Sequence, residues 1–198
     1  MFGLFKKKDK SPANLWSSFV GKGDSEKVPE EKAKLFAIVL LDWLKEGTDN
    51  LIKRVLDGKE VPTGMFGQIF FESAIFCIQY TDRIAVGILS EDQRGVFIDS
   101  LTAEIQTLLA EGQPDEEAKK RIHLLFMVQN SDRQKEYSKY KFVAENEEGY
   151  ANTLFWEFEK KIVKIFGFEE DIITLMDVHV SISSILNHLQ IPNLLETK

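Results

Sequence analysis

The stretch from Phe66 to Leu89 constrains most strongly what this chain can fold into. Drawn as a helix at 100° per residue, it carries apolar side chains on nearly every side and polar ones only in a narrow arc. Such a helix needs neighbours all round, because apolar surface left in water is unfavourable. The sequence therefore predicts a central helix over residues 66–89, about 36 Å long at 1.5 Å per residue.

The preceding and following segments carry helix start and stop signals. Pro29 predicts a helix start and Gly47 its end, after which Thr48 caps a second, short helix. Ser90 and Gln93 form a capping-box pattern for the helix after the central one. No segment shows the sustained alternation of apolar and polar residues that a strand would need. We therefore expect an all-α fold, a single-domain bundle of about seven to eight helices around the central helix.

The second half of the chain continues this pattern. Asp115 is expected to cap a helix that breaks somewhere between residues 131 and 134, and Asn146 to cap the next one. Gly167 is expected to end that helix, and a last helix is expected from about residue 170 to residue 190.

The first 28 residues differ in composition from the rest. They are polar, contain Pro12, Gly21 and Gly23, and predict a flexible arm ahead of a helical globular domain over residues 29–198. Cys77 is the single cysteine and stands among apolar residues, which predicts an inert buried thiol and a reducing, cytoplasmic location. No apolar run is long and uncharged enough to predict a transmembrane segment.

The net charge of −7 and the pI near 5.1 oppose binding to nucleic acid or to anionic lipid. A weak contact of residues 1–8, Met1 to Lys8, with a membrane surface is conceivable, because three apolar side chains stand beside a lysine cluster there. The acidic remainder of the chain opposes that contact as well.

Local signatures of catalysis, cofactor binding and metal binding are missing from the sequence. The residues three positions before His123, His179 and His188 are not carboxylates, so the Glu-x-x-His pair of di-metal bundles is absent. There is no G-x-S-x-G elbow and no phosphate-binding loop. We therefore predict no catalytic residue, no cofactor and no metal ligand.

Two sets of residues are candidates for ligand binding. Gln68, Glu72, Gln79 and Arg83 fall within about 60° of arc on the central helix, either as its solvent-facing strip or as the polar lining of a cleft. His179 lies in the apolar arc of the last helix, either as a hydrogen-bonded core histidine or as a ligand or proton-transfer residue.

Trp156 and Val163 are candidates for an interface. They project from a different side of their helix than the apolar stripe that begins at Leu154. A second apolar side packs either on another part of the same chain, such as another helix or the amino-terminal arm, or on a partner. Tryptophan is enriched at interfaces. This pattern predicts self-association as a homodimer.

Three functions are compatible with these features. The first is a non-catalytic protein-interaction or regulatory module, favoured by the large apolar inventory and the absence of catalytic motifs. The second is a small-ligand-binding bundle that uses the polar strip on the central helix. The third is an enzyme without a local sequence signature.

Overall fold

The structure, a computed structural model, describes residues 29–142, 150–168 and 171–196. This part of the chain is predominantly helical, as predicted, and within it only an isolated bridge between Lys141 and Thr153 has β-character. The helices are α2 (Pro29–Leu56), α3 (Met65–Ala85), α4 (Glu91–Glu111), α5 (Glu116–Tyr137), α6 (Leu154–Ile165), α7 (Ile172–Leu189) and α8 (Ile191–Leu195).

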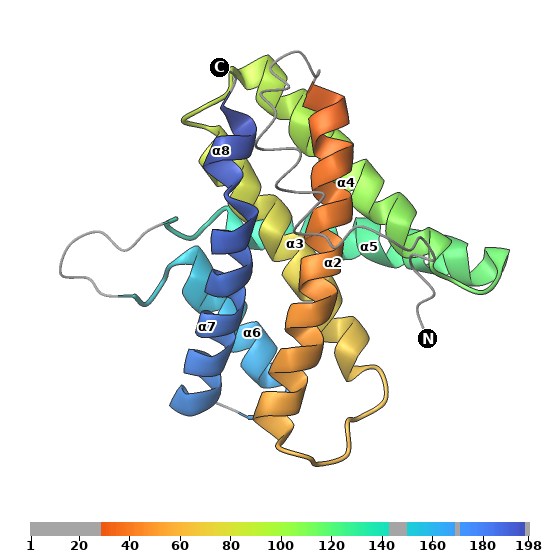
Figure 1. Cartoon of the computed structure of the whole chain (residues 1–198), viewed down its shortest axis with the longest axis vertical. Coiled ribbons are helices and arrows are strands. Elements are labelled where there is room, and N and C mark those ends of the chain that lie inside the picture. The colour runs from red at the N-terminus through yellow and green to blue at the C-terminus, as the bar shows by residue number, and fades with distance from the viewer. Residues whose placement is uncertain (1–28, 143–149, 169–170, 197–198) are drawn as a thin grey trace.

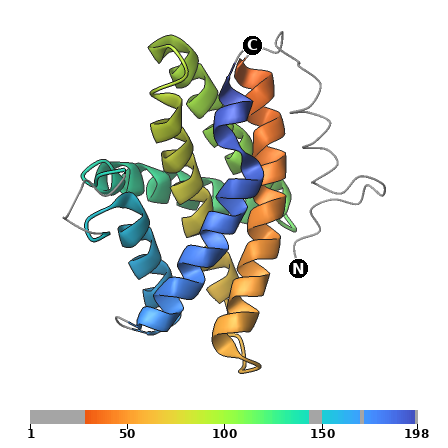
Figure 2. The ribbon, with the colours of Figure 1, turned by 60° about the vertical axis from the view of Figure 1, so that its left-hand side comes forward.

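Helix α3 lies in the middle of this arrangement and contacts α2, α4, α5, α6 and α8. Figures 1 and 2 show α2 and α7 side by side in opposite directions, while α5 crosses behind α3. The prediction of a central apolar helix is confirmed in position, but α3 ends at Ala85 and not at Leu89. Residues 86–89 form a turn instead, because the chain must reverse before Ser90 caps α4.

The predicted end of the first helix at Gly47 is wrong. Helix α2 continues through Gly47 and Thr48 to Leu56, a length of 28 residues. A Cβ atom on residue 47 would lie 2.5 Å from Ile185 Cδ1, so the glycine allows α7 to pack closely against α2. Packing against α7 offsets the low helix propensity of glycine, and Thr48 is a buried helix residue that caps nothing.

Helix α5 also differs from the prediction, since it runs unbroken through residues 131–134. Arg133, within the expected break, and Tyr137, just after it, both bond to Glu72 of α3 and hold this end of α5 in place. The expected cap Asn146 lies outside the described residues. Helix α6 instead begins at Leu154, where the Thr153 hydroxyl accepts a hydrogen bond from the Trp156 amide.

The capping signals of α4 and of the start of α5 are confirmed. Ser90 and Gln93 form the reciprocal capping box, and the Asp115 carboxylate accepts from the Ala118 amide. Gly167 follows the end of α6 with a φ of 80°, a left-handed conformation that glycine adopts without strain.

The core is centred on Phe76 of α3, whose ring is fully buried. It stacks on Phe158 at 4.1 Å between ring centroids and meets the Phe155 ring edge-on at 5.2 Å. In α3 the side chains of Phe70, Ile75 and Ile78 are buried, as predicted. Cys77 is buried too, and burial raises the pKa of its thiol. Ile84 is only partly buried, although Ala85 next to it is fully buried.

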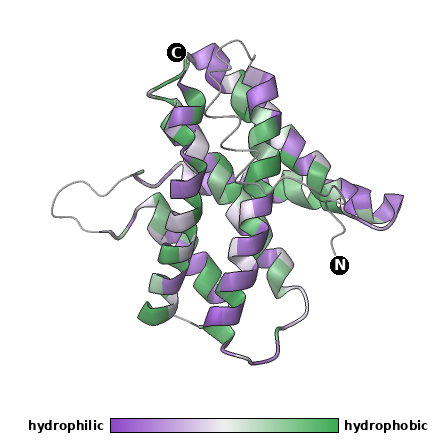
Figure 3. Cartoon of the chain, in the orientation of Figure 1, coloured by the Kyte–Doolittle hydropathy of each residue, from purple (hydrophilic) through white to green (hydrophobic). Residues whose placement is uncertain are grey.

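Among the described residues one segment, Ile172–Leu195, is long and apolar enough to cross a membrane by length and composition alone, and it is not the central helix. Only 39% of its apolar window is buried, and the core helix of a soluble protein passes the same test. The first turn of α7 is hydrophobic, as Figure 3 shows at lower left. The first half of α7 has four large apolar side chains that are 55–73% exposed: Ile172, Ile173, Met176 and Val180.

Candidate functional site

The four candidate residues of the central helix lie in different environments. Glu72 is buried, and both of its carboxylate oxygens accept hydrogen bonds from Arg133 Nε, at 2.7 and 2.9 Å. The Tyr137 hydroxyl donates to Glu72 Oε1 at 2.6 Å. Burial, reinforced by this carboxylate, raises the pKa of Tyr137 well above its ordinary value, so the hydroxyl stays protonated as a donor.

Arg83, at the other end of α3, donates from Nη2 to the main-chain carbonyls of Tyr137 and Tyr140, at 3.0 and 3.3 Å. Gln68 is exposed and Gln79 is partly buried. Glu72 therefore bonds to α5, and Arg83 bonds to the last residue of α5 and to the turn that follows it. A ligand role for these four residues stays a prediction, and the cavity described next is lined by other side chains.

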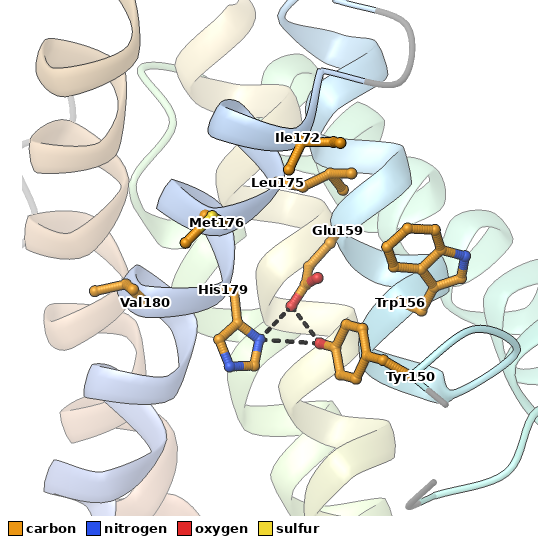
Figure 4. Close-up of a pocket in the computed structure, with 8 residues that line it drawn as sticks. All are labelled: Tyr150, Trp156, Glu159, Ile172, Leu175, Met176, His179 and Val180. Atoms are coloured by element: carbon orange, nitrogen blue, oxygen red, sulfur yellow. Dashed lines mark hydrogen bonds and ion pairs between the residues drawn. The ribbon is translucent and has the colours of Figure 1, made fainter. Parts of the chain in front are cut away.

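A cavity of about 470 Å³ lies between α6 and α7 and opens to solvent. Its walls are almost entirely apolar, with Ile172, Leu175, Met176 and Val180 from α7 and Trp156 from α6. Figure 4 shows the three polar side chains of its lining, Tyr150, Glu159 and His179, gathered on one side. This combination of apolar walls and a few converging polar groups is the usual composition of a small-molecule site.

Helices α6 and α7 position these polar groups. Glu159 follows Phe155 by four residues and precedes Ile162 by three, so it lies in the inward row of α6 and is almost fully buried. Its Oε1 accepts from the Tyr150 hydroxyl at 2.6 Å and lies 2.8 Å from His179 Nδ1 of α7. The same Nδ1 is 3.0 Å from the Tyr150 hydroxyl oxygen.

Burial dominates the acid–base behaviour of this cluster. It raises the pKa of Glu159, although hydrogen bonds from Tyr150 and His179 act in the opposite direction. Burial also raises the pKa of Tyr150, and the hydrogen bond to Glu159 adds to that effect. Tyr150 is therefore a neutral donor at every physiological pH.

The geometry selects one histidine tautomer when Glu159 is ionised. The single hydroxyl hydrogen of Tyr150 is donated to Glu159, so His179 Nδ1 must itself carry a hydrogen and donate it to the carboxylate. The other ring nitrogen, Nε2, then has a free lone pair in the neutral ring. It points away from Glu159 in Figure 4 and is available as a hydrogen-bond acceptor, since the His179 side chain is partly exposed.

The chemistry open to this site includes hydrogen bonding to a ligand and proton transfer. A carboxylate that orients an imidazole is an arrangement used for general bases. Among the described residues that line the cavity there is no serine, cysteine, threonine or lysine that such a base could activate. Across the described part of the chain, no three or more His, Cys, Asp or Glu side chains are grouped to hold a metal ion.

The two interface candidates lie in different environments. Val163 is buried in the core, while Trp156 is partly buried, lines the cavity and meets the Tyr150 ring edge-on at 5.8 Å between centroids. The alternative in which Trp156 packs under the amino-terminal arm lies outside the described residues. Self-association through Trp156 stays a prediction.

Sequence reasoning singled out His179 but missed Glu159 and Tyr150. A signal for Glu159 was present, because a carboxylate occupies the apolar row of α6 just as a histidine occupies the apolar arc of α7. Pairing two such polar residues from different helices requires knowing that the helices are neighbours. Tyr150 stands in a turn before α6 and carries no periodic signal.

Comparison with known proteins leaves the site to be interpreted from its own geometry. The chain matches no protein-family model, no curated protein and no solved structure.

Proposed function

We propose that this protein is a non-catalytic binding module that takes a small, mainly apolar molecule with one hydrogen-bond donor into the cavity between α6 and α7. The observation that carries the proposal is the Tyr150–Glu159–His179 cluster, set in a cavity of about 470 Å³ with apolar walls. The apolar body would replace water against Leu175 and Met176, and the donor would bond to His179 Nε2.

The charge at the cluster limits the ligand class. Glu159 is buried beside His179, so an anionic ligand group there would meet a carboxylate in a poorly solvated environment. A neutral amine, amide or hydroxyl donor has no such cost. The proposed ligand is therefore a neutral amphipathic molecule.

Fluorescence titration with 1-N-phenylnaphthylamine tests this directly, because the probe is apolar, neutral and has one N–H donor. Wild-type protein is expected to enhance its emission saturably, with a Kd in the micromolar range. Met176→Asp, which places a charge in an apolar wall, is expected to raise the Kd at least about tenfold, or roughly 1.4 kcal/mol.

Val86→Asp is the matched control, because Val86 is exposed and apolar but lies in the turn after α3, outside the cavity lining. It should bind the probe like wild type. A wild-type protein that gives no saturable signal, or a Met176→Asp variant that binds unchanged, would remove the proposal.

A protein-interaction function is a second candidate, favoured by the four exposed apolar side chains on the first half of α7.

We also propose that residues 29–198 form a single domain. Its support is that every helix from α2 to α8 contributes to one cluster of buried residues. Cytoplasmic location remains an expectation that rests on the single buried cysteine.

A further inference from the structure

Helix α5 has an apolar outer face that nothing in the described structure covers. Only Phe126 and Tyr137 of its 22 residues are buried, and both lie on the side that meets α3 and α4. Leu124, Leu125, Met127 and Val128 are 44–63% exposed, and at 100° per residue they surround the direction opposite Phe126. An amphipathic helix normally carries its polar residues on that side.

Charged residues flank this apolar face in a symmetric order. Glu117 lies nine residues before Phe126 and Lys135 nine residues after it, and both point directly away from the buried face. Arg121 precedes and Asp132 follows the apolar group, on the same edge of the face. All four are exposed. Each end of the face therefore carries one acidic and one basic side chain, in opposite order about a point at Phe126. Within one chain Glu117 already pairs with Arg121 at 3.1 Å, on the exposed surface where such a pair contributes little.

We propose that this face of α5 is the surface by which two copies of the chain associate, with their α5 helices antiparallel across a two-fold axis near Phe126. In this arrangement Leu124 and Val128 of each copy meet at the centre. Glu117 of one copy then lies opposite Lys135 of the second copy, and Arg121 lies near Asp132 of the second copy. Each pair occurs twice, as two-fold symmetry requires.

The charges exclude the parallel alternative. Parallel α5 helices related by a two-fold axis would place Glu117 against Glu117 and Lys135 against Lys135. Such like-charge contacts disfavour association. An antiparallel second copy covers the apolar centre of the face and places opposite charges together at its ends. A second copy of this chain is therefore the partner that the face fits.

The size of the face sets the expected strength. At 1.5 Å per residue, the segment from Glu117 to Lys135 is about 27 Å long. Four apolar side chains with their charged flanks bury on the order of 1,000 Å² in total over both copies, the lower end for specific interfaces. The dimer is therefore expected to have a Kd in the micromolar range.

Sedimentation equilibrium of the full-length chain measures this association. Wild type is expected to be a reversible dimer at tens of micromolar, and Val128→Asp is expected to raise the dimer Kd at least tenfold. Val128 is exposed, so the variant should keep its helical circular dichroism. Ile173→Asp, on the exposed face of α7, is the matched control and should dimerise like wild type.

Charge exchange and cross-linking test the antiparallel sense. Glu117→Lys and Lys135→Glu should each weaken the dimer several-fold, while the variant with both changes should recover wild-type affinity. A mixture of Glu117→Cys and Lys135→Cys proteins should form a disulfide-linked dimer that neither protein forms alone; native Cys77 is buried and does not interfere. Monomeric wild type at about 100 µM, a dimer lost in Ile173→Asp but kept in Val128→Asp, or cross-linking of Glu117→Cys with itself would each overturn the proposal.

Discussion

Replacing Glu72 by alanine tests whether this residue holds α5 on the core. The side chain is 8% exposed and is bonded to Arg133 and Tyr137. Its loss leaves the buried Tyr137 hydroxyl without an acceptor, which costs about 1–3 kcal/mol. It also removes one of the two carboxylate partners of Arg133, at a cost below that of an unpaired buried charge, because Arg133 keeps its 3.0 Å bond to Glu136 and its side chain is 29% exposed. The expected destabilisation is therefore about 3 kcal/mol.

Urea unfolding followed by circular dichroism measures this value, given an unchanged m-value. Asp49→Ala is a suitable comparison, because Asp49 also forms an ion pair but one that is exposed on α2, and its loss should change stability by no more than about 0.5 kcal/mol. Adding Tyr137→Phe to Glu72→Ala should recover about 1 kcal/mol, because it removes the orphaned hydroxyl.

A loss below about 1 kcal/mol for Glu72→Ala would refute the structural role assigned to this carboxylate. Such a result would return Glu72 to the ligand-binding hypothesis, since a buried charge kept for function is commonly neutral or stabilising to remove.

Three further outcomes follow from the packing and electrostatics. Gly95→Ala, in α4 with open space where the new Cβ would lie, should stabilise the protein by up to about 1 kcal/mol. For Gly47→Ala, the close approach of α7 should cancel or reverse this gain, and thermal unfolding of the two variants compares them. Ile75→Ala should cost about 2–5 kcal/mol and Ile84→Ala distinctly less, because only Ile75 is fully buried, and denaturant unfolding ranks the two. Glu159→Gln should gain stability relative to wild type as the pH rises from about 4 to about 8. The raised pKa of Glu159 means that its contribution is complete below the ordinary carboxyl pKa and is lost as the pH passes through the raised value.

Each of these outcomes has a clear opposite. Equal stabilisation by both glycine replacements would show that α2 and α7 are farther apart at residue 47 than the structure has them. Equal losses for the two isoleucines would show that the Ile84 side chain is as fully buried as that of Ile75. A pH-independent difference for Glu159→Gln would mean that the carboxyl ionises as readily in the folded state as in water.

The sequence alone determined the features that depend on neighbours along the chain. Side-chain periodicity identified α3 as central and the chain as helical, because a helix that is apolar on all sides has no stable alternative to burial. Caps at Ser90 and Asp115 were equally visible, since an N-cap bonds to a main-chain amide only three residues away. The same local logic failed at Gly47, where a contact with Ile185 outweighs the intrinsic preference of glycine.

Only the tertiary structure decided which polar residues meet. From the sequence, Glu72 was expected to face either solvent or a cleft. Nothing in the sequence shows that Arg133 and Tyr137, more than sixty residues later, form hydrogen bonds with its carboxylate. Glu159 and His179 stand twenty residues apart on separate helices, and their carboxylate–imidazole contact exists only because α6 and α7 pack together. Periodicity specifies which side of a helix is buried, but hydrogen bonds between helices depend on their relative position and rotation, and the whole core sets those.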